Sequence, residues 1–515
     1  MYVVTGDEMR QIDRYTMESI GLKEETLMES AGQSFCRQLI PTLGKNERIV
    51  VLIGTGNNGG DGFVIGRLLQ DAGYETDVWV IPPEEKIHGT AKTHKLIYER
   101  SGYQWVSYAA GAAHRLEKQL RQATVIIDAL LGTGLIGKPR SPYREVIDIV
   151  NAAKGRIISV DIPSGIPSKE GNDADIAGVK ADETYSFQAP KLSAFRYPEA
   201  GYYGKLRVLD IGIPAKAFRD LSIVRKVIAE DGVRDTLPNR APNAHKGSVG
   251  KALIIGGSRT MTGAPVLSTN ACLRAGAGLI TLAVPEEIQS IVSVKTTEAT
   301  FFPIESDNGS WELDTFAEAF PLHGFQSIAI GPGLGRAQSH HYFSVFDQYE
   351  GSLVIDADGL YYLSRELAEW TNGRKGGPTI ITPHPGEMAA LTGKTIAEVE
   401  KNRFAISKQF ACAYRMYVVL KGPYTIITTP EGVQWVNTTG KPSLAKGGSG
   451  DVLTGIITAF LLQHRCVSEA LCNAVHIHGK LADKLAETHD IISVTASDLV
   501  ESLPVVLRSY RYRSY

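Results

Sequence analysis

The stretch RIVVLIGTGNNGGDG, residues 48–62, decides how the first half of the chain folds. It opens with a continuous apolar run, Arg48–Ile53, of the kind found in parallel strands that are buried on both faces. A glycine-rich loop follows, and then a helical pattern through Val64 and Leu68. Strand, glycine-rich loop and helix together are typical of a Rossmann-like α/β domain, in which ligands bind at the carboxyl ends of the strands.

The loop at residues 57–62 (NNGGDG) differs from the usual dinucleotide-binding fingerprint, because two asparagines and an aspartate interrupt the glycine spacing. Amide oxygens in such a loop can bind a hard cation or a ribose, and glycine N–H groups can bind a phosphate. The sequence therefore predicts a specialised ligand-binding loop.

Further strand-like runs in the first half occupy residues 76–81, 124–128, 156–161, 183–187 and 206–211. The carboxyl ends of parallel strands share one edge of a sheet, so polar residues at these ends should lie close together. An aspartate that closes a strand is often only a turn or cap residue, and the expectation therefore depends on the whole set. The residues that we expect to converge are Asn58, Asp128, Asp161 and Ser164.

Composition limits the classes of function. With 515 residues the chain is long enough for about three domains or two large ones. A formal net charge of -2 gives no electrostatic argument for nucleic acid or an anionic membrane surface. The longest apolar run, near residues 456–462, is too short to span a bilayer. Five cysteines without close pairing are typical of reduced thiols, and the N-terminus has no signal-peptide pattern, so we expect a cytoplasmic protein.

A charged, proline-containing segment between residues 215 and 244 separates the two halves, and we expect it to lack strands. We place the boundary at 222/223, which gives domains 1–222 and 223–515. Strand-like runs alternate with helical segments in the second half, so a second, largely parallel sheet is predicted. These runs lie at residues 251–255, 279–284, 327–330, 353–356, 379–382 and 417–420.

The segment KGGSGD, residues 446–451, leads directly into an apolar helix. The first turn of a helix presents unpaired N–H groups, and glycines allow this backbone to approach a phosphate closely. A phosphate cradle alone needs no negative charge. We therefore interpret Asp451 as a base that takes a proton from an attacking hydroxyl. The alternative is an ordinary glycine-rich loop in which Asp451 caps the helix.

His384 stands between two prolines, which hold its backbone rigidly, as suits a residue that touches a substrate. A lone histidine is more often structural, and that alternative stays open for His384.

The first half resembles the NAD(P)HX epimerase family, which inverts the C6 hydroxyl of hydrated NADH or NADPH. The resemblance covers about residues 1–218 and depends on segments 57–62, 128–138 and 160–165 (VDIPSG). It implies a Rossmann-like three-layer domain in which Asp161 contacts the substrate and is the acid/base residue. The other implied substrate-binding residues are Asn57, Asn58, Gly59, Gly60, Asp61, Gly132, Thr133, Gly134, Leu135, Ile136, Gly137 and Lys138. The implied potassium ligands are Asn58, Asp128 and Ser164.

The second half is similar to the ADP- or ATP-dependent NAD(P)HX dehydratase family, which has a ribokinase-like fold. The resemblance runs from about residue 229 to 507, and its motifs lie at 245–250, 256–258, 262–265, 331–335, 384–387 and 447–451. It implies that the hydrated nicotinamide nucleotide contacts Ala264, Gly335, His384 and Asp451. It also implies that ADP or ATP contacts Lys421, Gly422, Pro423, Tyr424, Thr425 and Gly450.

The two resemblances together imply a repair enzyme whose first half interconverts the C6 epimers and whose second half dehydrates one of them. Phosphorylation of the C6 hydroxyl, with Asp451 as base and Mg²⁺ assisting, would turn a poor leaving group into a good one. K⁺ and Mg²⁺ are thus the expected ions. Fused chains of this kind look bacterial, which favours ADP over ATP as co-substrate. We also expect a homo-oligomer with no nucleic-acid or membrane partner.

Two other interpretations stay open at this point. A ribokinase-like vitamin kinase would release a stable phosphorylated product from the second half. In the second interpretation, which belongs to a different functional class, the first half is a non-catalytic nucleotide sensor or a protein-binding module.

Overall fold

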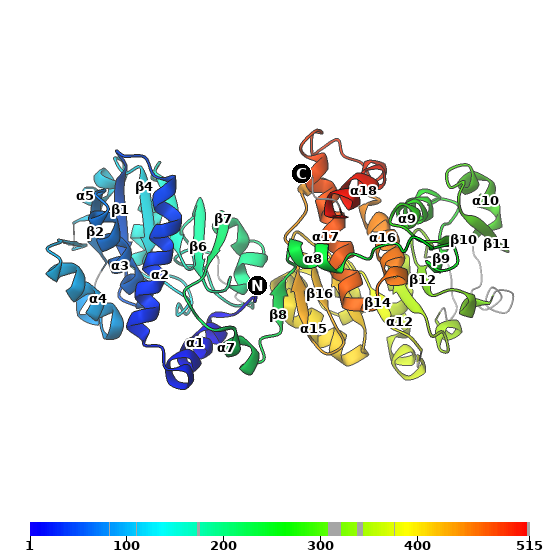
Figure 1. Cartoon of the computed structure of the whole chain (residues 1–515), viewed down its shortest axis with the longest axis horizontal. Helices are drawn as coiled ribbons and strands as arrows, with labels where there is room; N and C mark the ends of the chain where they lie inside the picture. Colours follow the sequence, from blue (N-terminus) through cyan, green and yellow to red (C-terminus); the bar gives the residue numbers. More distant parts are fainter. Residues whose placement is uncertain are drawn as a thin grey trace. The chain divides into compact units, whose positions relative to one another are not determined.

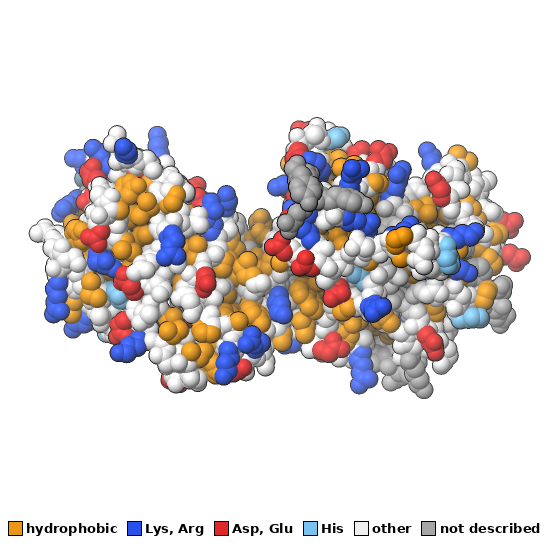
Figure 2. Space-filling view, in the orientation of Figure 1, with side chains coloured by type: hydrophobic (Ala, Val, Ile, Leu, Met, Phe, Trp, Pro, Cys, Tyr) orange, Lys and Arg blue, Asp and Glu red, His pale blue; other side chains and the backbone are white. Residues whose placement is uncertain are grey.

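The computed structural model describes residues 1–81, 83–109, 111–171, 176–306, 321–336, 343–374 and 376–511. They form two compact units, Met1–Arg225 and Lys226–Tyr515 (Figure 1). This division falls close to the boundary expected at 222/223. Figure 2 shows acidic and basic side chains intermixed over the visible face of each unit. Within the described residues, no helix has the length and apolar character needed to cross a membrane.

In the described part of the first unit the strands form one parallel sheet with the order β3-β2-β1-β4-β5-β6-β7. The first strand in the sequence, β1, lies inside the sheet. The next two strands, β2 and β3, extend the sheet to one edge, and β4 pairs with the other side of β1. The strand order therefore reverses between β1 and β4, the place where doubly wound sheets open a crevice for a ligand. The strands are β1 (Arg48–Ile53), β2 (Glu75–Val80), β3 (Val106–Ser107), β4 (Val125–Ala129), β5 (Arg156–Val160), β6 (Glu183–Phe187) and β7 (Lys205–Leu209).

Helices cover both faces of this sheet (Figure 1). Apolar side chains from α2, α3 and α4 pack on one face, and those from α5 and α6 pack on the other. This arrangement confirms the three-layer α/β prediction for the first half. The helices are α1 (Gly6–Tyr15), α2 (Glu24–Leu39), α3 (Asn57–Asp71), α4 (Gly89–Arg100), α5 (Ala113–Leu120), α6 (Tyr143–Asn151) and α7 (Ala215–Asp220).

The described part of the second unit contains a longer sheet, with the order β11-β10-β9-β12-β13-β14-β15-β16-β17-β8. Neighbours from β11 to β15 are parallel, whereas β15, β16 and β17 pair antiparallel. The strands are β8 (Arg225–Val227), β9 (Lys251–Ile255), β10 (Leu279–Pro285), β11 (Thr300–Ile304), β12 (Ser327–Ile330), β13 (Ser352–Ile355), β14 (Thr379–Ile381), β15 (Tyr417–Leu420), β16 (Ile426–Thr428) and β17 (Gln434–Val436).

The expectation that residues 215–244 lack strands is wrong, because β8 lies there at the edge of the second sheet. β8 has three residues, two of them basic, so it carries no apolar run to reveal it. The strands β3, β16 and β17 were also not predicted, because two or three residues are too few to form a recognisable apolar run.

Helices also cover both faces of the second sheet (Figure 1). One apolar core includes α8, α9, α16, α17 and α18, and the other includes α12, α13 and α15. Residues 452–460 of α16 are all buried, which explains why this helix is apolar on every side. The helices are α8 (Glu230–Thr236), α9 (Gly263–Arg274), α10 (Glu286–Ser293), α12 (Asp358–Gly373), α13 (Pro385–Thr392), α14 (Ile396–Lys401), α15 (Arg403–Tyr414), α16 (Ser449–Gln463), α17 (Val467–Leu485) and α18 (Ala496–Arg511).

Candidate active sites

A cavity of 710 Å³ lies at the carboxyl ends of the first sheet. Its walls come from α1, α2, the start of α3, the loop after β4 and the end of β5. The structure thus brings together segments that are far apart in the sequence. The predicted substrate-binding residues that line it are Asn57, Asn58, Asp61, Gly132, Thr133, Gly134, Leu135, Ile136 and Asp161.

Four other predicted substrate-binding residues, Gly59, Gly60, Gly137 and Lys138, are not part of the described cavity wall. A Cβ atom on Gly59 would lie 1.9 Å from the carbonyl oxygen of Gly54, and one on Gly60 would lie 2.5 Å from the sulfur of Met28. These two glycines therefore let α3 pack closely against its neighbours. Direct substrate contact by any of the four stays a prediction.

A hydrogen-bonded network joins the predicted potassium ligands at the end of β4. The fully buried carboxylate of Asp128 accepts hydrogen bonds from Ser159 Oγ at 2.7 Å and from the backbone N–H of Ser164 at 2.9 Å. Ser164 Oγ in turn accepts from the N–H of Leu131 at 2.8 Å. Asn58 Nδ2 donates to the carbonyl of Leu131 at 3.2 Å. Asn58, Asp128 and Ser164 therefore converge, with Leu131 between them.

Asp161 follows β5 with a left-handed backbone, φ 62°, which is uncommon outside glycine. Its Oδ1 accepts a hydrogen bond from the N–H of Phe187 at 2.9 Å and forms an ion pair with Lys191. Lys191 is fully buried and also donates to the carbonyl of Ala189 at 3.1 Å. Lys191 thus pairs with Asp161 in the wall of the cavity. Sequence reasoning missed Lys191 because no motif marks it.

We expect Lys191→Met to destabilise the first unit by about 3 kcal/mol, near the lower end of the cost of breaking a buried ion pair. The side chain of Asp161 keeps 16% of its surface exposed in the cavity, which limits the penalty for its uncompensated charge. Calorimetric unfolding measures this change. Lys169→Met, at an exposed lysine, is the matched control and should unfold like the wild type. Equal stability of the two variants would contradict the ion pair.

Asp13 and Asp61 are two further carboxyl groups in the cavity wall. Burial is the main cause that raises the pKa of Asp13 to about 7, and it also raises the pKa of Asp61 well above the ordinary range. The sequence did contain a signal for Asp13. It follows the helical spacing of Met9 and Ile12, which places a carboxyl group where the pattern calls for an apolar side chain.

Asp451 lies in the first turn of α16, behind the N-cap residue Gly448. The alternative in which Asp451 caps this helix is therefore wrong, since the cap position belongs to Gly448, whose φ is 89°. Burial and the nearby charge of Asp356 raise the pKa of Asp451 to about 7, although Lys421 opposes the shift. Within the described residues, no hydrogen bond occupies the Asp451 carboxylate, so it remains available to a ligand.

Lys421 organises the acidic groups around Asp451. Its Nζ lies 2.9 Å from Asp356 Oδ1 and 3.8 Å from Glu387 Oε2. Asp356 also accepts a hydrogen bond from Thr454 Oγ1 at 2.6 Å, and Thr454 is one turn beyond Asp451 on α16. Burial alone would raise the pKa of Asp356, but Lys421 and Thr454 hold it below the ordinary value. Burial raises the pKa of Glu387 to about 7.

Several predicted nucleotide-binding residues lie beside this cluster. A Cβ atom on Gly450 would be 3.4 Å from Lys421 Nζ, so these two residues are neighbours. Arg403, a buried residue that sequence reasoning missed, donates to the carbonyls of Lys421 at 3.2 Å and Tyr424 at 3.1 Å. It thereby fixes the turn that contains Gly422, Pro423, Tyr424 and Thr425. Their contacts with a nucleotide stay predictions.

The remaining predicted residues have visible structural roles. His384 is the N-cap of α13, and its Nδ1 accepts hydrogen bonds from the N–H groups of Gly386 at 3.0 Å and Glu387 at 3.2 Å. Its ring is exposed, with a pKa lowered first by burial and then by Lys421, so a substrate contact is compatible with capping. The N–H of Gly335 donates to Asp358 at 3.0 Å. Ala264 lies against the 331–335 loop, 3.1 Å from a Cβ placed on Gly333.

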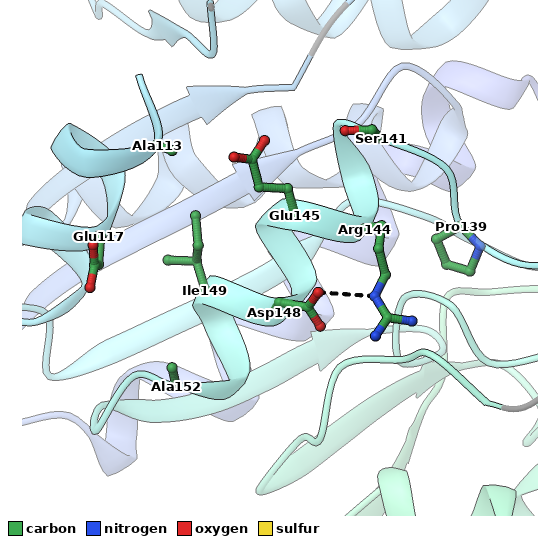
Figure 3. Close-up of a pocket in the computed structure, with 9 residues that line it drawn as sticks. All are labelled: Ala113, Glu117, Pro139, Ser141, Arg144, Glu145, Asp148, Ile149 and Ala152. Carbon is green, nitrogen blue, oxygen red and sulfur yellow. Dashed lines mark hydrogen bonds and ion pairs between the residues drawn. The ribbon is translucent and has the colours of Figure 1, made fainter. Parts of the chain in front are cut away.

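A second hollow of the first unit, 690 Å³ in volume, lies between α5 and α6 (Figure 3). Figure 3 shows Arg144 paired with Asp148 there, with 3.0 Å between Nε and Oδ2. None of the predicted site residues lines it. It lies in the helical layer, away from the predicted sites, so its residues are suitable for control variants.

Comparison with known proteins agrees with this geometry. A family model described as NAD(P)H-hydrate dehydratase matches residues 252–505, and one described as YjeF-related protein N-terminus matches residues 24–193. The bifunctional NAD(P)H-hydrate repair enzyme of Moorella thermoacetica is 36% identical, over 99% of this chain and 97% of its own length. The same enzyme of Thermofilum pendens is also 36% identical, with the same coverage of both chains.

A solved structure gives the same result for the second unit. The ADP/ATP-dependent NAD(P)H-hydrate dehydratase of Bacillus subtilis, co-crystallized with ATP and Mg²⁺, is 33% identical. It covers 55% of this chain and 98% of its own length, with a TM-score of 0.50. This match confirms the ribokinase-like prediction. Because it is 36% identical to these fused relatives over 99% of its length, the chain belongs to the family of bifunctional NAD(P)H-hydrate repair enzymes.

Proposed function

We propose that the first unit epimerises the C6 hydroxyl of hydrated NADH and NADPH, and that the second unit dehydrates one epimer at the expense of ADP or ATP. The observation that carries this function is Asp451. It is a free carboxylate at the start of a glycine-rich helix, close to a lysine, with its pKa raised by burial to about 7. General bases work best with a pKa near the working pH.

In the dehydration, Asp451 takes the proton of the C6 hydroxyl as the hydroxyl oxygen attacks the terminal phosphorus of ADP or ATP, and AMP or ADP leaves. The C6–O bond then breaks and inorganic phosphate leaves. Loss of the C5 proton restores the C5=C6 double bond of NAD(P)H. Backbone N–H groups at the start of α16 and the ammonium of Lys421 face the transferring phosphoryl group and stabilise its charge. Hydroxide is a poor leaving group and phosphate a good one, which explains the nucleotide requirement.

The acidic groups around Lys421 fit a magnesium ion. Carboxylate oxygens are the ligands that Mg²⁺ prefers, and Glu387 and Asp451 have pKa values raised by burial and by nearby carboxylates, as expected where a cation is needed. No described group of three His, Cys, Asp or Glu side chains could hold a metal alone. Glu387 and Asp451 would therefore hold Mg²⁺ only together with the nucleotide, and the ion would supply positive charge for the phosphate groups. We propose ADP as the co-substrate, with ATP as the alternative.

A potassium ion fits the network at the end of β4. Asn58 Oδ1 is buried and has no hydrogen-bond partner among the residues that the structure describes. A buried acceptor without a donor is costly, and a cation satisfies it. We propose that Asn58, Asp128 and Ser164 hold K⁺, which would supply a fixed positive charge beside the cavity.

Replacing Asn58 by leucine should abolish the effect of K⁺ on stability. For the wild type, each 1 kcal/mol of stabilisation by bound K⁺ raises the melting temperature of a domain of this size by about 2–4 °C. Differential scanning calorimetry in KCl and in equimolar choline chloride measures the shift. Asn151→Leu, outside the cavity, is a control for loss of an amide and should keep it. A K⁺ shift that survives in Asn58→Leu would place the ion elsewhere.

The assay that tests the whole function supplies purified protein with both epimers of hydrated NADPH and either ADP or ATP. We expect near-ultraviolet absorbance of NADPH to return, with stoichiometric release of phosphate. A stable phosphate ester without regained absorbance would instead identify a small-molecule kinase. Persistence of the unused epimer throughout would refute the epimerase assignment.

A further inference from the structure

Three aspartates from separate segments face the cavity of the first unit: Asp13 on α1, Asp61 on α3 and Asp161 after β5. Lys191, the buried cation of this wall, is paired with Asp161. Among the described residues, the carboxyl group of Asp13 has neither a hydrogen bond nor an ion pair. The other charged residues of the cavity wall are Arg10, which is paired with Asp7, Arg14 and Glu24.

The surroundings of Asp13 and Asp161 therefore differ. Burial raises the pKa of Asp13 to about 7, the charges of Asp161 and Glu24 add to the shift, and Lys191 opposes it. Near neutral pH a large fraction of Asp13 is therefore protonated, whereas Asp161 has the side-chain nitrogen of Lys191 beside it. Two carboxyl groups in one site with different surroundings, one without a partner and one paired with a lysine, are suited to the roles of acid and base.

Epimerisation of hydrated NAD(P)H needs such a pair, provided that the proposed function of the first unit holds. C6 carries a hydroxyl and the ring nitrogen N1, so it is a hemiaminal carbon. Removal of the hydroxyl proton by Asp161 forms the C6=O double bond, the C6–N1 bond breaks, and its electron pair goes to N1. A proton donor must then complete the N1–H bond. Rotation about C5–C6 and the reverse steps close the ring with the opposite configuration.

We propose that Asp13 is the catalytic acid that donates this proton to N1 and takes it back on ring closure. The free enzyme returns to the same state after each turnover, with Asp161 charged and Asp13 protonated. The C6 oxygen stays on the substrate throughout, and no oxidant, reductant or water enters the reaction.

This role fixes the direction of the pH dependence. Asp13 must be protonated, so kcat/KM for epimerisation falls as the pH rises through about 7. The fall has the same midpoint for either epimer as substrate, because both directions start from the same protonation state of the enzyme.

Asp13→Asn in the full-length protein tests the proposal, with epimer exchange followed by chromatography of the two hydrates between pH 5.5 and 9. We expect kcat to fall about 10²-fold and the alkaline decline to disappear. Asp13→Glu keeps a carboxyl group at this position. It should retain part of the wild-type kcat and should still lose activity at alkaline pH. Asp148→Asn, the same change at the exposed pair drawn in Figure 3, should behave like the wild type. A wild-type rate and an unchanged decline in Asp13→Asn would overturn the proposal.

Isotope labelling of the wild type gives a second test that does not depend on the folding of a variant. In ¹⁸O-labelled water, ring opening leaves the C6 oxygen of the epimerised product unlabelled. Label that enters at the rate of epimerisation would show that the C6–O bond breaks, and Asp13 would then not act on N1. If the wild type fails to exchange the epimers at all, the proposed function of the unit is wrong, which is a different result from either of these.

Discussion

Asp451→Asn is expected to lower the rate of nucleotide-dependent dehydration by about 10⁴-fold, the upper end of what a general base contributes. Asparagine has nearly the same shape, but it cannot accept the proton of the C6 hydroxyl. Epimerisation should continue at the wild-type rate, because the residues proposed for it lie in the other unit. The measurement is the recovery of NADPH absorbance in single turnovers with saturating nucleotide.

The wild-type rate of dehydration should rise with pH, in the opposite direction to epimerisation. Burial and Asp356 raise the pKa of Asp451 to about 7, and the base acts only when ionised. The rate is therefore low below pH 7, rises through it and levels off above it. The residual rate of Asp451→Asn should lack this acid limb.

Stability provides the control for Asp451→Asn. A carboxyl group whose pKa is raised on folding binds more protons in the native state, so its contribution to stability decreases as the pH rises from about 4 to 7. The neutral asparagine avoids this cost, and the variant should unfold no earlier than the wild type at pH 8. Asp235→Asn, an exposed change on α8, should leave the activity intact. Dehydration by Asp451→Asn within threefold of the wild-type rate, about 0.7 kcal/mol, would exclude Asp451 as the base.

The sequence predicted the parts of both sites that depend on local pattern. Buried parallel strands can be recognised as apolar runs, and ligands bind at their carboxyl ends. Of the residues chosen on this basis, Asn58 and Asp161 line the cavity of the first unit, and Asp451 lies near Asp356 and Lys421. The glycine-rich start of α16 could likewise be predicted from the sequence, because the start of a helix depends on residues that are neighbours in the chain.

Residues whose roles depend on distant partners were not predictable in the same way. Lys191 matters because it is buried against Asp161, which is 30 positions earlier in the chain. Arg403 matters because it holds a turn about 20 positions later, and nothing in the local sequence around it indicates that. Asp13 attracted no functional prediction, because its place in the cavity with Asp161 depends on the fold. A single sequence records local preference but not which side chains meet across the fold.

Asp161→Asn is expected to stop epimer exchange, with a loss of about 10⁴-fold, because asparagine cannot take the hydroxyl proton. With both epimers and ADP supplied, the wild type should consume all the hydrate. The variant should consume one epimer at the normal rate and then stop, so its own dehydratase activity reports that the chain is intact.

Asp161→Asn also leaves Lys191 buried without a counter-charge. The single variant should therefore lose both epimerase activity and free energy of unfolding. The double variant Asp161→Asn with Lys191→Met separates the two effects. Removal of both charges should restore most of the unfolding free energy lost in either single variant, as coupling between contacting residues requires. Epimer exchange should stay absent in the double variant. Exchange that returned together with stability would mean that Asp161 serves the fold rather than the reaction.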